Sequence, residues 1–381
     1  MPPNDELNAL RSDLDYEALI EKASPALRLY ISTLEQENAR LRQEVLELRQ
    51  SVAGRRRAAA TRERSTDTPA PSVVTVRHPE DVMVIAVTGQ GLAKRTPLND
   101  YSTQRRGGIG IFDIQAPRDD PVAHLLVARE SAAVLVLSSR GRAFRVPVDS
   151  LPLTEMRGRG TSLPGRLMLT NDETIGALLA LDDERDGGSN LLIATASGWV
   201  RSLHRNYVGP RLQPGTLLSD PRRGGPPAAM ALSDGEGDLL VATRSGLGYR
   251  FSERLLRREG VSGIQVRPGD ALAGIASIGG DEDDVLLVTG DGQGARRNMG
   301  GFSANKSPGG QGKILMKTDA LAGLARVTGT CEAMCASGLA KVIRFAVDEV
   351  PAKSGSVQGV NVMDCRSDSL TAMAVIHPPH P

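Results

Sequence analysis

Basic residues recur at a nearly constant distance behind a series of turn glycines in the second part of the chain. Six apolar stretches each run into a small turn, whose glycines are Gly91, Gly141, Gly198, Gly246, Gly292 and Gly338. A lysine or arginine follows three or four residues later in every case: Lys94 and Arg95, Arg145, Arg201, Arg250, Arg296 and Lys341. A polar strand face would explain polarity at these positions, but not a uniform positive sign. Like charges at equivalent positions suit a curved polyanion, because cations that neutralise phosphates release the counterions condensed on DNA.

A second basic element follows the first of these turns and joins the first repeat to the second. It is the run Gln104-Arg105-Arg106-Gly107-Gly108-Ile109-Gly110. Two arginines can make bidentate contacts with phosphate, and glycines let the backbone approach an anion and present N–H groups to it. The residues alone leave two interpretations open: an anion-binding loop, or an exposed glycine-rich connection with solvated arginines.

No catalytic or metal-binding pattern stands out. Cys331, Cys335 and Cys365 are few and odd in number, which indicates reduced thiols in strands rather than a disulfide framework or metal ligands. The chain has no G-x-x-x-x-G-K-[ST] phosphate loop, and the run 290–294 is only a weak nucleotide-loop look-alike. We therefore expect no enzymatic activity of the chain by itself, no cofactor and no metal.

The period of the repeats predicts the fold. The turns recur about every 50 residues, and a second glycine corner follows each one, at Gly108, Gly160, Gly215, Gly263, Gly312 and Gly359. Units of about 40–50 residues with several short strands each are typical of propeller blades. A single blade cannot bury both of its faces, so the ring has to close. We predict an all-β, six-bladed β-propeller over residues 80–381.

The chain before this domain has a different pattern. Residues 25–53 are predicted to form a coiled-coil helix, with Pro25 at its first position and residues 1–24 as a tail. The heptad positions carry Ile31, Leu34, Asn38, Leu41, Val45 and Leu48. β-Branched residues and one Asn at a, with Leu at d, favour a parallel two-stranded coil, so we expect a dimer. A helix folded back onto its own domain is the alternative. Residues 54–79, rich in arginine, are predicted to be a basic flexible linker.

The composition leaves the partner open but restricts the location. The net charge is +1, so nucleic-acid binding would depend on how charge is distributed rather than on its total. The first residues contain no apolar signal region, and no run approaches the 18 apolar residues that a membrane helix needs. We expect a soluble, cytoplasmic protein without a membrane partner.

Several stretches resemble a known family. EDVMVIAVTGQGLAKRTPLNDYSTQRRGGIG, which starts at Glu80, resembles the first blade of the C-terminal domain of the DNA gyrase A subunit. GRAFRVPVDSLP, GYRFSERLL and KVIRFAVDEVP resemble its later blades, and GWVRS is closer to the topoisomerase IV version. The resemblance covers roughly residues 80–377. It implies a β-pinwheel, whose blades exchange strands, with a positive rim that bends duplex DNA. It also identifies Gln104, Arg105, Arg106, Gly107, Gly108 and Gly110 with the family's Q-R-R-G-G-(basic)-G box, from which Ile109 departs.

The resemblance separates this chain from the members of the family that cut DNA. Those members carry a large region with a winged helix and an Arg-Tyr nucleophile, whereas none of the five tyrosines here follows an arginine. We therefore expect a non-catalytic architectural or accessory factor that binds and bends duplex DNA. We also expect it to associate with the nucleoid, with a type II topoisomerase as the candidate protein partner. The alternative is a propeller scaffold that binds proteins and not DNA, and a propeller enzyme is disfavoured.

Overall fold

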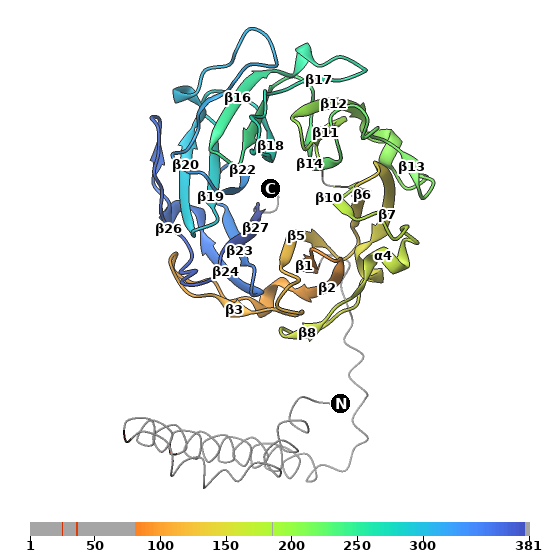
Figure 1. Cartoon of the computed structure of the whole chain (residues 1–381), viewed down its shortest axis with the longest axis vertical. Coiled ribbons are helices and arrows are strands. Elements are labelled where there is room, and N and C mark those ends of the chain that lie inside the picture. Colours follow the sequence, from red (N-terminus) through yellow and green to blue (C-terminus); the bar gives the residue numbers. More distant parts are fainter. Residues whose placement is uncertain (1–24, 26–35, 37–80, 185, 378–381) are drawn as a thin grey trace. The chain divides into compact units, whose positions relative to one another are not determined.

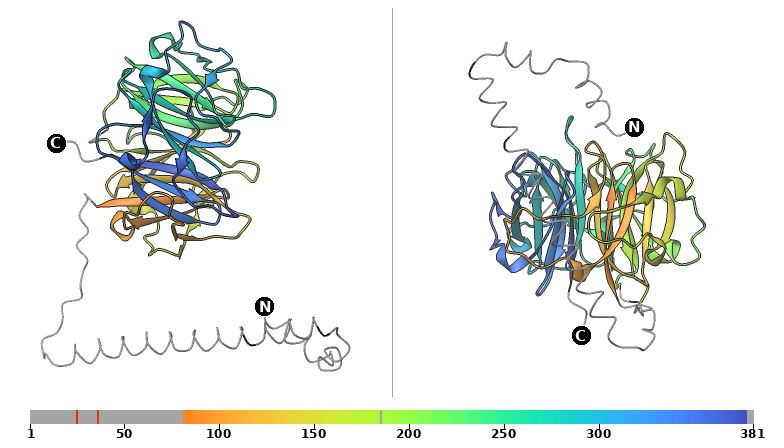
Figure 2. Two further views of the ribbon diagram at one scale, coloured as in Figure 1. Left: turned by 90° about the vertical axis from the view of Figure 1, so that its left-hand side faces the viewer. Right: turned by 90° about the horizontal axis from the view of Figure 1, so that it is seen from below.

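The computed structural model describes residues 81–184 and 186–377, together with Pro25 and Gln36. The residues described between 81 and 377 form six mainly antiparallel sheets around a central axis (Figure 1), together with a two-stranded parallel sheet. Seen from the side, the strands run across the thickness of the ring (Figure 2). The prediction of a six-bladed, all-β propeller is therefore confirmed. Among the described residues, no helix is long and apolar enough to cross a membrane.

The expectations for the first 79 residues concern segments that, apart from Pro25 and Gln36, lie outside the described residues. They are the tail 1–24, the coiled-coil helix 25–53 and the basic linker 54–79. The proposed dimer contacts therefore stay predictions: Ile31, Leu34, Asn38, Leu41, Val45 and Leu48.

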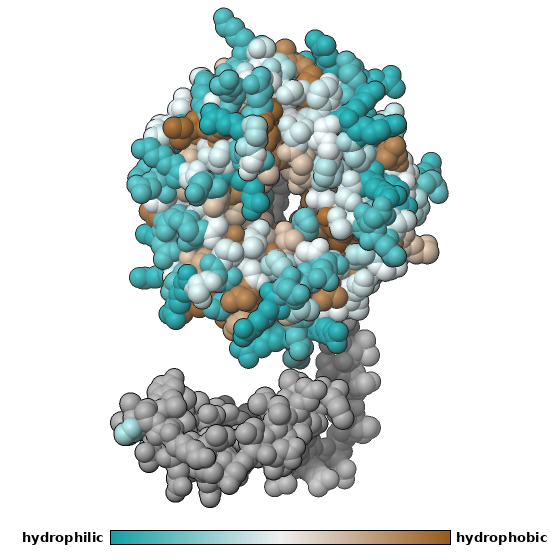
Figure 3. Space-filling view, in the orientation of Figure 1, coloured by the Kyte–Doolittle hydropathy of each residue, from teal (hydrophilic) through white to brown (hydrophobic). Residues whose placement is uncertain are grey.

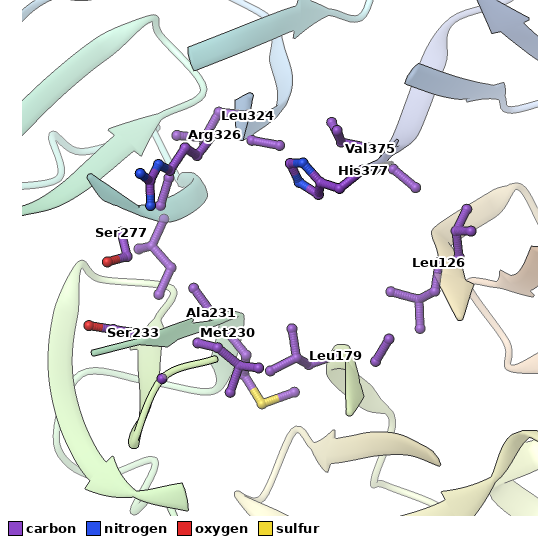
Figure 4. A pocket seen from close by; sticks show the side chains of 18 of the residues that line it. Leu126, Leu179, Met230, Ala231, Ser233, Ser277, Leu324, Arg326, Val375 and His377 are labelled. Carbon is purple, nitrogen blue, oxygen red and sulfur yellow. The ribbon is translucent and has the colours of Figure 1, made fainter. Parts of the chain in front are cut away.

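Each blade is built on a hairpin and an inner strand. The hairpins are β1–β2 (Val82–Thr88, Leu92–Pro97), β6–β7 (Ala133–Ser138, Arg142–Pro147), β11–β12 (Asn190–Thr195, Trp199–His204), β15–β16 (Asp238–Thr243, Leu247–Ser252), β19–β20 (Asp284–Thr289, Gln293–Asn298) and β23–β24 (Glu332–Ser337, Lys341–Ala346). The inner strands are β5 (Val122–Arg129), β10 (Ile175–Leu181), β14 (Pro227–Ser233), β18 (Leu272–Ile278), β22 (Leu321–Val327) and β27 (Leu370–Ile376). The inner strands surround a channel of about 630 Å³, lined largely by apolar side chains such as Leu126, Leu179 and Met230 (Figure 4).

The outer strand of each blade comes from the repeat that follows it in the sequence. These strands are β9 (Thr161–Ser162) on β2, β13 (Thr216–Leu217) on β7, β17 (Val261–Ser262) on β12, β21 (Lys313–Ile314) on β16 and β26 (Val360–Asn361) on β20. The sixth blade receives β3 (Ile111–Phe112) from the first repeat, which closes the ring without a covalent link. This is the strand exchange that the family resemblance implied.

Short elements connect the hairpins to the exchanged strands. A 3₁₀ helix follows every hairpin: η2 (Leu98–Asp100), η3 (Val148–Ser150), η4 (Arg205–Val208), η5 (Glu253–Leu255), η6 (Met299–Gly301) and η7 (Val347–Glu349). We call the segment that starts after each 3₁₀ helix and runs to the end of its exchanged strand a corner. The corners also contain β8 (Gly158–Arg159), which pairs with β4 (Ile114–Gln115), and β25 (Ala352–Lys353). α4 (Leu163–Arg166) follows β9.

The central hairpin strands have continuous apolar sequences because both of their faces are covered by neighbouring blades. In β6 all six residues are buried, and in β11, β15, β19 and β23 only the first residue is not. An exposed antiparallel sheet would instead alternate apolar and polar residues. Branched and small aliphatic side chains, with few aromatics, therefore fill the interfaces between blades.

The hairpin turns correct one alignment made from the sequence. Gly91, Gly141, Gly198, Gly246 and Gly292 all have positive φ. In the sixth repeat the equivalent position is Ala340, with φ 61°, and Gly338 lies two residues earlier. A left-handed alanine costs about 1 kcal/mol, which one turn of a large domain tolerates. The register of the sixth repeat is thus shifted by two residues from the one we predicted.

Candidate nucleic-acid interface

The arginine at the fourth position of most second hairpin strands reaches the next blade. Arg95 donates to the carbonyl oxygens of Asp149 and Leu151, at 2.9 and 2.8 Å, around the 3₁₀ helix of the second blade. Arg145 makes the same kind of contact with Val208 O at 2.9 Å. The full set of these bridging arginines is Arg95, Arg145, Arg250, Arg296 and Arg344. Arg250 and Arg344 likewise donate to backbone carbonyl oxygens of the next blade, whereas Arg296 reaches the next blade through the carboxylate of Asp348.

Carboxylates neutralise all five bridging arginines. Arg95 pairs with the buried Glu130, and Arg145 with Asp183 at 2.6 Å. The other three pair with the acidic residue that begins the first hairpin strand of their own blade: Arg250 with Asp238, Arg296 with Asp284 and Arg344 with Glu332. The third blade lacks both charges, because Asn190 and Ser202 occupy these positions. The bridging arginines therefore stabilise the ring.

These contacts revise the DNA-binding prediction for several residues. Arg95 and Arg250 are buried and fully engaged, so a phosphate cannot reach them. Arg145 and Arg296 are partly exposed, but each is already paired with a carboxylate: Arg145 with Asp183, and Arg296 with Asp348. The pattern in the sequence was real, but its cause is the contact between blades. A single strand does not show which of its polar residues face a neighbouring blade.

Lys94 is also internal. Its side chain is fully buried, and its Nζ lies 2.6 Å from Asp113 Oδ1, which also accepts a hydrogen bond from Tyr101 OH at 2.5 Å. Burial lowers the pKa of Lys94, and the Asp113 carboxylate opposes that shift. Burial, and then the same carboxylate, raise the pKa of Tyr101. Lys94 thus joins the residues on either side of the basic box and is not available to DNA.

Arg201 and Lys341 do not occupy the bridging position. Arg201 lies one residue before it and donates to Leu218 O at 3.1 Å. Burial, and then the neighbouring Arg223, lower the pKa of Arg201. Lys341 lies at the start of β24, where its Nζ is 5.5 Å from the centre of the Phe112 ring. Both side chains are partly exposed, so they remain candidates for contact with an anion.

The box Gln104–Gly110 closes the ring, whereas the sequence alone indicated only a link between the first two repeats. Gln104 N donates to Arg344 O at 2.7 Å, in the sixth blade. Arg106 holds the neighbouring elements through its backbone N–H to Glu349, at 3.0 Å, and through its guanidinium to Asn361 O, at 3.0 Å. Gly107 N donates to Val362 O at 2.8 Å. We call this junction of the box and β3 with the sixth blade the seam.

The box glycines are required by packing at the seam. A β-carbon on Gly108 would lie 2.9 Å from Gln104 Oε1, and one on Gly110 would lie 2.9 Å from Val342 O. Gly110 also has φ +77°, which few other residues adopt. Arg105 differs from the rest of the box. Its side chain is exposed and makes no hydrogen bond or ion pair with the described residues.

Exposed cations like Arg105 occur in every corner, and apart from Arg105 the sequence did not lead us to predict them. They are Arg105, Arg157, Arg159, Arg211, Arg257, Arg258, Lys306, Lys313 and Lys353, which we call the corner cations. All nine are exposed, and none makes a side-chain hydrogen bond or ion pair within the described part of the chain. The same corners hold only two carboxylates, Glu155 and Glu259. The signal was present in the sequence, as a basic residue in each of the glycine corners that follow the turns.

The corners lie at the periphery of the ring. Figure 1 places β3, β8, β13, β17 and β26 around the outside, and the inner strands around the centre. Hydrophilic residues are prominent along this outer edge (Figure 3). The chain carries a net charge of only +1, but the nine corner cations lie where a long ligand could contact all six repeats.

The fold and the corners define a strand-exchanged, six-bladed propeller with basic corners. The family model described as the DNA gyrase C-terminal domain, beta-propeller, matches residues 83–129, 132–175, 237–278, 283–327 and 332–376. These segments make up more than half of the chain, so the chain belongs to this family. The matched segments do not include the third hairpin, where the charged bridge is replaced by Asn190 and Ser202.

Individual relatives agree with this assignment. The chain is 28% identical over 295 residues to the DNA gyrase A subunit of Staphylococcus epidermidis, an alignment that covers 75% of this chain and 33% of the relative. It is 28% identical over 312 residues to the corresponding protein of Haloquadratum walsbyi, with coverage of 78% and 36%. The chain thus spans about a third of the length of these relatives.

Solved structures show the same fold. The structure of the DNA gyrase A C-terminal domain matches with a TM-score of 0.68 and 19% identity, over 78% of this chain and all of that one. The C-terminal domain of DNA topoisomerase IV matches with a TM-score of 0.53 and 17% identity, over 78% and 94%.

Proposed function

We propose that the propeller binds duplex DNA along its outer edge and bends it, as a non-catalytic architectural or accessory factor. The observation that carries this proposal is the contrast between two sets of cations. The bridging arginines are all paired with carboxylates, whereas the corner cations are exposed and unpaired in all six repeats. Unpaired surface charge contributes nothing to the fold, and a polyanion would supply the missing partners.

The geometry favours phosphate contacts over base reading. The corner cations are presented by short loops at repeated positions, and no helix or long ribbon projects from the described residues to enter a groove. Contacts with phosphates fix the position of DNA but carry little sequence information. Binding should therefore be largely independent of sequence and strongly dependent on salt.

The box supplies an anchor at the seam in this proposal. Gln104, Arg106, Gly107, Gly108 and Gly110 hold the seam together, and Arg105 projects from it as the free cation. Lys341 and Arg201 are secondary candidates. DNA that follows the edge would then meet a rigid phosphate contact at the place where the ring closes.

The wider assembly belongs to the same proposal. The chain would act in the cytoplasm in association with the nucleoid and dimerise through the predicted coiled coil. It would need no cofactor, metal or membrane. A type II topoisomerase is the candidate protein partner, because the relatives are subunits of DNA gyrase. The described residues offer no group of three or more His, Cys, Asp or Glu side chains that could hold a metal ion.

A salt titration tests this function directly. If each of the six corners neutralises about one phosphate, log K should fall with log salt with a slope of about −5, since each phosphate contributes about −0.9. A variant with Arg105, Arg159, Arg211 and Lys313 changed to Ala should have a shallower slope and weaker binding. Arg222→Ala is the control, because Arg222 is exposed but paired with Asp220 at 2.9 Å. If the propeller were instead a protein-binding scaffold, it would not bind DNA even at low salt. Absence of binding at low salt would therefore refute the proposal.

A further inference from the structure

A cavity of about 750 Å³ opens beside the seam. Phe112 of β3 and the following loop line one side, and the hairpin turn of the sixth blade, with Leu339, lines another. Arg118 and Arg157 complete the wall. Cavities of roughly 300–1,000 Å³ suit small molecules or one unit of a polymer. The wall of the cavity thus contains apolar groups, from Phe112 and Leu339, and basic groups, from Arg118 and Arg157. It lies where the box leads into the exchanged strand β3.

Phe112 is the unusual member of this wall. The chain contains five phenylalanines, and the other four are almost fully buried, while Phe112 is 47% exposed. Lys341 Nζ lies 5.5 Å from the centre of its ring and is the cross-strand neighbour of Phe112. The equivalent positions of two other exchanged strands hold serine, at Ser162 and Ser262, so the fold does not require an aromatic residue here.

The two arginines of the wall have no partners. Arg118 and Arg157 are both exposed, and neither side chain bonds to any residue that the structure describes. Arg157 has φ 65°, a left-handed conformation that is unfavourable for a non-glycine residue. Its backbone N–H donates to the carbonyl oxygen of Asp113, which fixes this conformation. Strained residues of this kind are concentrated at functional sites.

We propose that the seam cavity binds an unstacked nucleotide of DNA. The base would stack on Phe112, and Arg118 and Arg157 would contact the phosphates on either side of it. An aromatic face next to cations is the arrangement that holds single-stranded nucleic acid, because every base offers a π-face and every linkage offers a charge. The inference rests on the proposed DNA binding and adds a ligand class to it, namely a base that has left the helical stack.

Bending gives such a site a purpose. Duplex DNA that follows a tight curve kinks most easily where base steps unstack, and proteins that bend DNA commonly place an apolar side chain at the kink. A cavity that receives the displaced base would offset the cost of unstacking at one fixed point. Arg105, the free cation of the box, and Phe112, which lines the cavity, lie on the same connection and are seven residues apart.

The test compares two fluorescently labelled duplexes of equal length, one intact and one with a short single-stranded gap of thymidines at its centre. The full-length chain should bind the gapped duplex about tenfold more tightly at equal salt. Phe112→Ser should abolish this preference, because it should weaken binding to the gapped duplex much more than binding to the intact duplex. Arg157→Gly should weaken the preference, because it removes the proposed phosphate contact. Glycine is the replacement of choice because it adopts the local φ without strain. Tyr207→Ser is the control, since it removes an exposed aromatic side chain on η4.

The outcomes separate this inference from the function on which it rests. Equal binding of both duplexes by the natural chain, or a preference that survives Phe112→Ser, would overturn the cavity proposal and leave duplex binding intact. Failure to bind the intact duplex even at low salt would instead refute the proposed function. An acidic peptide with one aromatic residue provides the competing ligand. Phe112-dependent peptide binding without any preference for the gap would make the cavity a peptide site and also overturn the proposal.

Discussion

The guanidinium of Arg344, in the sixth blade, donates a hydrogen bond to the backbone carbonyl oxygen of Tyr101, in the first blade, 3.0 Å away and 243 residues earlier in the chain. A second bond from the same guanidinium reaches Leu98 O at 3.3 Å. Together with β3 on β24, these bonds join the end of the propeller to its beginning. The closure reuses the contact that links other neighbouring blades, because the first repeat presents the same 3₁₀ helix as the repeats that follow it.

Loss of one bridging arginine should destabilise the ring. Arg250 donates to Met299 O at 2.8 Å and pairs with Asp238 at 2.8 Å. Arg250→Met should lower the free energy of unfolding by about 2–3 kcal/mol, because it leaves the half-buried carboxylate of Asp238 without its cation and removes the hydrogen bonds that join the two blades. Urea denaturation would measure the change. Ser202→Ala, at the position in the third blade that naturally lacks the arginine, should cost less than about 0.5 kcal/mol. Equal losses in the two variants would contradict the bridging role.

The repeat period and the apolar strands were sufficient to predict the number of blades and the fold class. The exchange of outer strands came from the family resemblance, since a two-residue strand such as Thr161–Ser162 has no recognisable pattern of its own. Arg95 shows where prediction of the site failed, and Arg105 provides the contrast. Both are arginines near glycine turns, yet one is buried against the next blade and the other is exposed. Only the arrangement of neighbouring blades separates them.

Two glycines with the same conformation should differ sharply in their tolerance of alanine. Gly141 has φ +76°, and a β-carbon on it would lie 1.7 Å from Ser219 O, in the exchanged segment. Gly141→Ala should therefore displace that segment and cost more than about 3 kcal/mol. Gly269 has φ +83° with nothing near its missing β-carbon, so Gly269→Ala should cost only about 1 kcal/mol. Thermal unfolding of both variants would check the difference, and similar melting temperatures would show that the exchanged segment adapts easily.

An ion pair on the second blade should make stability depend on pH in acid. The Arg142 guanidinium bonds to the buried carboxylate of Glu173, with Nε 2.8 Å from Oε1, and lowers the pKa of Glu173 from 4.5 to about 2. Because the folded pKa lies below the unfolded one, the stabilisation is complete above about pH 4.5 and is lost as the pH falls toward 2. Glu173→Gln should cost about 2–3 kcal/mol at pH 7 and almost nothing at pH 2.

Urea titrations at several pH values would follow this difference. Glu259→Gln, which changes an exposed carboxylate on a corner, should leave the pH profile unchanged. If Glu173→Gln lowered stability equally at pH 7 and pH 2, the ion pair would not be the source of the effect.

The box should govern bending more than affinity. Arg105 is the free cation of the seam, whereas Arg106 is also bonded to Asn361 O, so Arg105→Ala should remove the proposed DNA contact without disturbing closure. The remaining corner cations can still hold a shorter, straighter segment of DNA. Bending a site costs on the order of 1–6 kcal/mol, so the loss of one strong contact can shift the balance toward unbent DNA.

Ile109 is 39% exposed, and Ile109→Lys should act in the opposite direction by restoring the basic residue of the family box. Plasmid topology after relaxation with each variant would measure the effect. Arg105→Ala should reduce the linking-number shift and Ile109→Lys should increase it, while Arg222→Ala leaves it unchanged. Equal shifts for all of these proteins would show that the box has no special role in bending and serves only to close the ring.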